Sequence, residues 1–143
     1  IIDEPTVGLD PQERANFRQL LTELADERCI IFSTHIVADV ESIADHIAIM
    51  QTGELIQSES PSALQEKVIN KCWRLTASIS ELKQIQHDFI VSHSVRKDDK
   101  VELNIVADFS PDARAISRAP SLEDAYLYFT STKHIQADFM RAC

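Results

Sequence analysis

The sequence predicts an α/β fold in residues 1–70 and a small α+β unit in residues 71–143. In the first part, short apolar runs alternate with segments of helical periodicity, as in proteins whose strands and helices alternate along the chain. In the second part, two strand-like runs flank a charged turn, which is typical of a hairpin. A hydrophobic content of 44% in 143 residues suits one ordinary domain, or a partial domain with an appendage.

The first elements of the α/β part are a strand, a helix and a second strand. Residues 1–4 are predicted to be the end of a buried strand. A helix is expected over residues 11–27, because Asp10 can accept bonds from free N–H groups and Pro11 is tolerated in a first turn. The continuous apolar run at residues 29–33 predicts a strand covered on both faces. The loop between the first strand and the helix is marked by Pro5, Gly8 and Pro11.

The later elements of this part continue the alternation. A short helix is expected over residues 36–44, and a helix that begins at Pro61 should run to residue 68. Between them, residues 46–50 and 54–57 flank Gly53, a pattern that indicates a hairpin. This order of strands and helices is the pattern of a doubly wound sheet.

The second part is predicted to contain three strands and two helices. Residues 73–78 alternate like a strand, and Ser80 is expected to cap the helix that follows. The hairpin is predicted from residues 89–95 and 101–106, and a final helix begins near Ser121. Its core is expected to contain five aromatic side chains: Trp73, Phe89, Tyr126, Tyr128 and Phe129.

Composition excludes several classes of protein. The net charge of −9 disfavours nucleic-acid binding, which depends on Lys and Arg that neutralise phosphates, so no nucleic-acid partner is expected. Three cysteines without a CxxC pair argue against a zinc site, and Cys29, beside an apolar run, is expected to be buried. The histidines His87, His93 and His134 are too scattered to suggest a metal site. No apolar stretch is long enough to cross a bilayer.

Polar residues that could carry chemistry follow two of the predicted strands. Asp3 and Glu4 end the first strand, and Thr34 and His35 follow the second, so all four should meet at one edge of a parallel sheet. Two adjacent carboxylates need a cation or a hydrogen-bond partner. We expect Asp3 to help hold Mg²⁺, Glu4 to orient or deprotonate a water, and His35 to donate a bond to a phosphate.

These segments resemble the ABC ATPases. Residues 1–11 (IIDEPTVGLDP) resemble the Walker B strand and D-loop of that family, and residues 30–35 (IIFSTH) resemble its switch segment. Residues 45–56 resemble the strand and hairpin that follow, and residues 61–64 resemble the next helix. Residues 120–126 (PSLEDAY) look like the closing motif of ATPase subunits in bacterial exporters of the drug or ABC-2 kind.

The resemblance implies a role for each matching residue. Asp3 matches the aspartate that supports Mg²⁺, and Glu4 matches the catalytic glutamate. Asp10 matches the D-loop aspartate, which acts across a dimer interface, and His35 matches the histidine that senses the γ-phosphate of ATP. His46 departs from the family, because an arginine is frequent there. The implied partners are a second ATP-binding subunit and a transmembrane permease, which would hold the subunit at the cytoplasmic face of the cell membrane.

The family's phosphate-binding loop has no counterpart in this sequence. That loop needs two glycines five positions apart, followed by Lys and Ser or Thr. The chain has only Gly8 and Gly53, and it begins with Ile1 rather than Met. We therefore expect residues 1–70 to be the C-terminal portion of an ABC ATPase domain, followed by an α+β accessory domain at residues 71–143. The whole subunit would hydrolyse ATP with Mg²⁺. The chain of 143 residues alone should bind neither ATP nor Mg²⁺ and should be inactive.

Two other interpretations remain open at this point. The first is an ATPase of the same superfamily that acts in DNA repair or chromosome structure instead of transport. Such proteins share the Walker B, D-loop and switch segments, although the Gly53 hairpin and the acidic second part fit a transporter subunit better. The second is a non-catalytic regulatory or dimerisation module. The transported substrate is not encoded in these residues.

Overall fold

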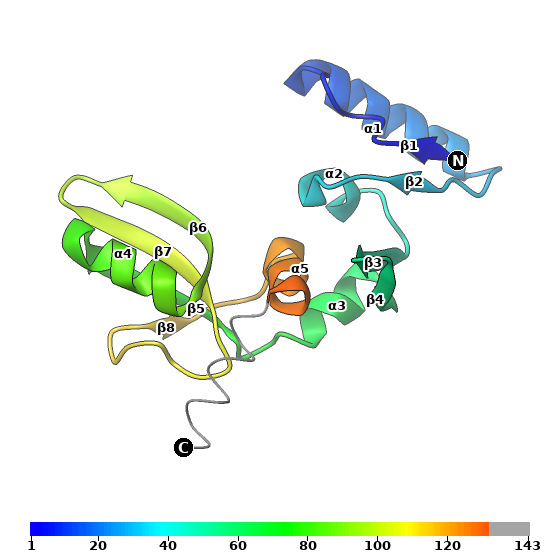
Figure 1. The fold of residues 1–143 in the computed structure, drawn as a ribbon. Helices are drawn as coiled ribbons and strands as arrows, with labels where there is room; N and C mark the ends of the chain where they lie inside the picture. The colour runs from blue at the N-terminus through cyan, green and yellow to red at the C-terminus, as the bar shows by residue number, and fades with distance from the viewer. Residues whose placement is uncertain (132–143) are drawn as a thin grey trace.

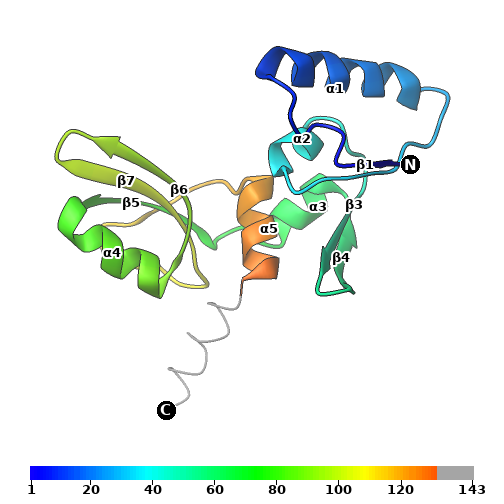
Figure 2. The same cartoon turned by 45° about the horizontal axis from the view of Figure 1, so that its top comes forward.

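The computed structural model describes residues 1–131, which form five helices and eight strands in three separate sheets. His134 and Cys143 lie outside the described residues. The chain has a mixed α/β fold, as the sequence predicts. Helix α5 (Leu122–Thr130) lies between the larger sheet and the hairpin of the first part in both views (Figures 1 and 2).

The first sheet is a parallel pair of very short strands. Strand β1 (Ile2–Asp3) pairs with β2 (Phe32–Ser33), and helix α1 (Pro11–Ala25) connects them. The helix begins where Asp10 and Pro11 predict, because the Asp10 carboxylate accepts a bond from the Glu13 N–H at 2.8 Å. The predicted helix boundary is therefore confirmed at its start and lies two residues beyond the observed end.

The sequence predicts that the first two strands are buried, and this prediction is wrong. Ile31 is 58% exposed, Ile1 and Ile2 are also exposed, and Cys29 is exposed as well. Within residues 1–131, β1 and β2 pair only with each other, so no further strand flanks them. Among the described cysteines it is Cys72 that is buried, and burial raises the pKa of its thiol to about 12.

The hairpin around Gly53 is confirmed, but it forms a sheet of its own. Strands β3 (Ile47–Gln51) and β4 (Glu54–Glu59) are antiparallel, and Thr52 and Gly53 between them have φ values of 51° and 84°. Two consecutive left-handed residues form the tight turn that matches the twist of a hairpin. The predicted doubly wound sheet is therefore not present in residues 1–131, because the hairpin does not pair with β1 or β2.

Two short helices flank the hairpin in sequence. Helix α2 (Val37–Glu41) precedes it, and helix α3 (Pro61–Glu66) follows it. The Ser60 hydroxyl caps α3 by accepting a bond from the Ala63 N–H at 3.3 Å. Both helices lie where the sequence predicts them, although both are shorter than expected.

The first hydrophobic core joins segments that are far apart in sequence. Helix α5 packs on α3 and α2, and the Gln51 amide donates to the carbonyl of Thr130 at 2.9 Å. Half-buried side chains from α2, the hairpin and α5 surround this core. Its buried members are Ile49, Leu64, Val68, Cys72, Leu122 and Ala125. The last helix thus completes the core of the hairpin segment.

The second core lies between the larger sheet and helix α4 (Ile79–Asp88). The sheet has the order β6-β7-β5-β8, and the hairpin predicted in this part is confirmed as β6 and β7. Ser78, not Ser80, is the N-cap of α4, because its backbone N–H bonds the Glu81 carboxylate at 2.8 Å. The four strands are β5 (Cys72–Ser78), β6 (Ile90–Lys97), β7 (Lys100–Val106) and β8 (Ile116–Ser117).

The aromatic residues expected in the interior pack against the two cores. Trp73 and Phe89 contact the second core, and the Trp73 indole N–H donates to the carbonyl of Ala107 at 3.0 Å. Tyr126, Tyr128 and Phe129 of α5 contact the first core. The prediction that these side chains fill the core of the second part is therefore confirmed for Trp73 and Phe89 and wrong for the three aromatic residues of α5, which pack against the first core instead.

A buried ion pair fixes the start of α5. Asp124 is completely buried, and the Arg118 guanidinium donates to its Oδ1 at 2.6 Å. The second oxygen, Oδ2, accepts bonds from the backbone and hydroxyl of Ser121, both at 2.8 Å. Burial alone would raise the pKa of Asp124, but the bonds from Arg118, Ser92 and Ser121 hold it below the ordinary value of 3.8.

Replacement of this carboxylate should destabilise the chain in a pH-dependent way. Asp124→Asn should lower the free energy of unfolding at pH 7 by on the order of 3 kcal/mol, because it leaves Arg118 without its charged partner. The pKa of Asp124 is depressed in the folded chain, so its stabilisation is present above pH 3.8 and is lost as the pH falls through the folded pKa. The difference between wild type and variant should therefore narrow below pH 3.8.

Urea unfolding between pH 2.5 and 7 measures this difference. The matched control is Glu123→Gln, which changes the exposed neighbour on the same turn and should alter stability by less than about 0.5 kcal/mol. A gap between wild type and Asp124→Asn that stays constant with pH would contradict the assignment.

Candidate functional site

The carboxyl ends of β1 and β2 bring three of the predicted site residues together. The Nδ1 atom of His35 lies 2.9 Å from Oε1 of Glu4, although the two residues are 31 positions apart in sequence. Asp3 accepts a hydrogen bond from the Ser33 hydroxyl through its Oδ1. The two acids and the imidazole therefore share one edge of the parallel pair, as the sequence predicts.

The backbone around Glu4 explains how its side chain reaches His35. The Glu4 N–H donates to the carbonyl of Ser33 at 3.0 Å, which extends the pairing of the strands by one residue. At Glu4 the chain turns, because this residue has a φ of 45°, a left-handed conformation that is uncommon outside glycine. Strained backbone of this kind occurs preferentially at functional sites. Gly8, with a φ of 84°, then completes the loop that leads to α1.

The segment on the other strand is held by its own local bond. The Thr34 hydroxyl oxygen accepts a bond from the Ile36 N–H at 3.1 Å, just before α2 begins. The His35 side chain is 70% exposed, so a ligand could approach its ring from solvent. The bond between Thr34 and Ile36 thus holds the segment that carries His35, and Glu4 contacts its ring, while the outer side of the ring stays accessible.

The carboxylate of Glu4 is only partly used by the protein. Its Oε1 faces His35, but its Oε2 is buried and has no hydrogen-bond partner within residues 1–131. A buried acceptor without a donor costs free energy, and its presence indicates that a water, an ion or a ligand supplies the missing contact. This oxygen is therefore the atom of the site that is best placed to bond a water molecule.

The donor set fits a magnesium ion that is held mainly by other ligands. In the part of the chain that the structure describes, no group of three His, Cys, Asp or Glu side chains could hold a metal ion. Mg²⁺ in phosphate-transfer sites usually binds one or two carboxylates, several waters and the phosphates of the substrate. Asp3 could supply such a carboxylate directly or through water, because its side chain is exposed.

Asp10 is not part of this cluster. Its carboxylate caps α1 through the Glu13 N–H, and its own backbone N–H donates to the Glu13 carboxylate at 2.9 Å. Within residues 1–131 no hydrogen bond or ion pair joins it to Asp3, Glu4 or His35. Any function across a dimer interface would have to be combined with this capping role.

The sequence did not point to a buried acid behind the site. Asp39 of α2 is 2% exposed and forms an ion pair of 3.5 Å with Arg18 of α1, and its Oδ2 has no partner in the described residues. The Thr6 hydroxyl is likewise buried without a partner there. An acid among the apolar residues Val37 and Val40 is the sequence signal that could have identified Asp39. The ion pair connects α1 to the helix that follows His35.

The fold and the site define a mixed α/β protein with two acids and a histidine at the carboxyl ends of parallel strands. No family model matches the chain. The chain is similar to the energy-coupling factor transporter ATP-binding protein EcfA2 of Staphylococcus aureus strain bovine RF122 / ET3-1, with 32% identity over 104 residues. It is 30% identical over 102 residues to the same protein of strain USA300.

These relatives are longer than the chain. The matched region covers 69% of this chain and 35% of each relative. The chain therefore spans about a third of the length of the curated proteins that it matches. Among residues 1–131, none of the helices combines the length and the apolar character that a membrane span requires.

The capping role of Asp10 can be tested by substitution. Asp10→Ala should lower the free energy of unfolding by about 1 kcal/mol, because the first turn of α1 loses its cap. Asp10→Asn should be close to wild type, since an amide oxygen caps equally well but carries no charge. Thermal unfolding followed by circular dichroism measures both. Equal destabilisation by the two variants would show that the charge, not the cap, stabilises this helix.

Proposed function

We propose that the chain is part of the ATP-hydrolysing subunit of an ABC transporter. The observation that carries the proposal is the 2.9 Å contact between Glu4 and His35 beside Asp3, at the carboxyl ends of two parallel strands. The similarity to ATP-binding proteins of energy-coupling factor transporters supports the same class. A γ-phosphate near this edge would meet one carboxylate for a metal, one for a water and one imidazole.

Each residue has a distinct task in this proposal. Asp3 supports a Mg²⁺ ion, which would neutralise phosphate charge when bound. Glu4 orients the attacking water through its unpaired Oε2 and takes its proton. His35, held by Glu4 through Nδ1, presents the other side of its ring to the γ-phosphate and stabilises the charge that develops there. Asp10 acts on the site of a second subunit.

The catalytic unit requires polypeptide that these 143 residues do not include. No glycine-rich phosphate-binding loop is present, and such a loop supplies most contacts to the phosphates. We propose that this chain alone neither binds nor hydrolyses ATP appreciably. In the whole protein, two ATP-binding subunits would assemble with a transmembrane permease at the cytoplasmic face of the membrane.

Two finer parts of the proposal depend on the second half of the chain. Residues 71–143 form an accessory domain, supported by their own sheet and hydrophobic core, although α5 packs on the first part. Export as the direction of transport is supported only by the closing motif at residues 120–126. In the structure Ser121 and Asp124 of this motif also have a structural task, as the cap and buried ion pair of α5.

The first test is Glu4→Gln in a full-length subunit that contains these residues. ATP turnover should fall about 100-fold or more, because the general base is lost, while the affinity for ATP should be retained. Steady-state phosphate release and ATP binding measure the two quantities. The control is Glu27→Gln, the same change at an exposed position, which should leave turnover intact. Wild-type turnover in the Glu4 variant would remove the catalytic role.

The second test uses the chain of 143 residues itself. Millimolar ATP with Mg²⁺ should not raise its melting temperature, because a ligand stabilises a fold only if it binds it. Differential scanning fluorimetry with and without the nucleotide measures this. A clear upward shift would show that these residues hold ATP without a glycine-rich loop.

A further inference from the structure

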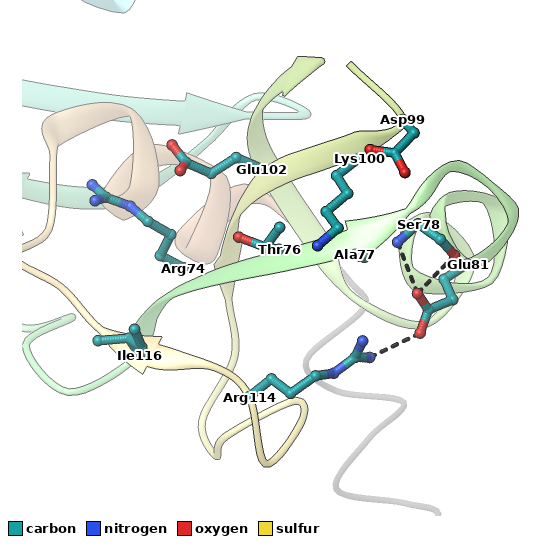
Figure 3. A pocket seen from close by; sticks show the side chains of 10 residues that line it. All are labelled: Arg74, Thr76, Ala77, Ser78, Glu81, Asp99, Lys100, Glu102, Arg114 and Ile116. Atoms are coloured by element: carbon teal, nitrogen blue, oxygen red, sulfur yellow. Dashed lines mark hydrogen bonds and ion pairs between the residues drawn. The ribbon is translucent and has the colours of Figure 1, made fainter. Parts of the chain in front are cut away.

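The four-stranded sheet has one covered face and one open face. Helix α4 packs on the first face, where Leu75, Leu103 and Ile105 are buried. The residues that alternate with them on β5 and β7 point to the other face. They line a hollow of about 560 Å³ together with Ala77 of the second core, Glu81 of α4 and Arg114 of the loop before β8. Figure 3 shows this hollow on the open side of β5. The residues that line it are Arg74, Thr76, Ala77, Ser78, Glu81, Asp99, Lys100, Glu102, Arg114 and Ile116.

Three exposed side chains from two strands line the hollow: Arg74, Thr76 and Lys100. Lys100 is the cross-strand partner of Ser78, and Arg74 lies four residues before Ser78 on the same strand. At a rise of about 3.3 Å per residue, the two cations start about 13 Å apart along the strands, with Thr76 midway between them. Both side chains are long enough to reach a group bound above the Thr76 hydroxyl.

Two of the acidic side chains that line the hollow already form ion pairs within the chain. Glu102 bonds the Lys97 ammonium at 2.9 Å, and Glu81 bonds the Arg114 guanidinium at 2.8 Å. Bonds from Arg114 and Ser78 hold the pKa of Glu81 at about 2, so this carboxylate is ionised and fully occupied. Asp99 lies in the turn at the rim of the hollow (Figure 3).

The cations Arg74 and Lys100, in contrast to these acids, have no bonded partner in the described residues. Within residues 1–131 neither side chain makes a hydrogen bond or an ion pair, and the Thr76 hydroxyl also makes none. Arg74 acts on Glu102 only through space. The hollow is lined by three cations and three acids, and Arg74 and Lys100 are the two of these cations that no acid bonds directly. The Thr76 hydroxyl lies between them along the strand, and Glu102 is the cross-strand partner of Thr76.

We propose that this hollow binds an anion that carries phosphate groups, with Arg74 and Lys100 as its charged ligands and Thr76 as a hydroxyl donor. Guanidinium and ammonium groups form strong, short bonds to phosphate oxygens. A volume of about 560 Å³ would hold a small molecule or a lipid headgroup. This site is separate from Asp3, Glu4 and His35, and it does not depend on the proposed ATPase function.

The first experiment maps binding on the unmodified chain. Pyrophosphate is titrated into the ¹⁵N-labelled chain, and the backbone amide resonances are followed by NMR. Saturable shifts should appear at Arg74, Thr76 and Lys100. No saturable shift, or shifts confined to residues 3–4 and 33–35, would overturn the proposal.

The second experiment removes the two cations. The double variant Arg74→Ala, Lys100→Ala should bind pyrophosphate with an affinity at least about tenfold lower than that of the wild type, as expected for the loss of charge-assisted bonds. The matched control is Arg28→Ala, Lys83→Ala, which removes one Arg and one Lys from exposed positions outside the hollow. The control should retain wild-type affinity, and equal loss in both double variants would show that only net charge matters. If the double variant does not fold, Lys100→Ala alone and the mapping on the unmodified chain decide the outcome.

A third measurement identifies the source of the phosphate group. The chain is sedimented with vesicles of phosphatidylglycerol and, separately, of phosphatidylcholine. Binding to the first vesicles that the double variant loses would identify an anionic lipid headgroup, whereas binding to pyrophosphate alone would identify a soluble phosphate compound. Failure to bind either probe would overturn the site.

Discussion

The parallel pairing of β1 and β2 is the constraint on which the candidate site depends. Asp3 lies opposite Ser33, so the residues that follow each strand, Glu4 and Thr34-His35, emerge at the same edge. A shift of this register would move the end of one strand past the other by about 3.3 Å per residue and would disrupt the contact between the carboxylate and the imidazole. Because each strand has only two residues, the pairing cannot be stable by itself and needs support from the rest of the fold.

Part of that support comes from contacts far along the chain. The segment with His35 leads into α2, and α2 packs on α5 and is bonded to α1 through Asp39 and Arg18. Helix α5 in turn is bonded to the segment that leads into the larger sheet, because Lys71, the residue before β5, donates to the Tyr128 hydroxyl at 2.6 Å. Burial would lower the pKa of Lys71, but its bonds to Asp108 and Tyr128 raise it, so the lysine stays charged in this contact. The site and the second sheet are therefore parts of one connected structure.

Local signals in the sequence were sufficient for most elements. Asp10 and Pro11 set the start of α1, and Gly53 set the turn of the β3–β4 hairpin, because caps and tight turns depend on a few adjacent residues. Apart from the cap of α4, which is Ser78 and not the predicted Ser80, the main errors concern non-local features. The sequence predicts that Cys29 and Ile31 are buried and that the strands form one doubly wound sheet, and the structure shows neither. An apolar run indicates the preference of a segment for burial, but it does not indicate whether another element covers that segment.

The sequence by itself determined the residue types of the site and the helices and strands that carry them. It identified Asp3, Glu4 and His35 and placed them at or just beyond the carboxyl ends of two strands. Only the tertiary structure decided that Glu4 and His35 are 2.9 Å apart, that the Asp10 carboxylate is engaged in a cap, and that Arg74 and Lys100 share an open sheet face. The physical reason is that these relations depend on strand pairing and side-chain packing between distant segments, which local conformational preferences do not specify.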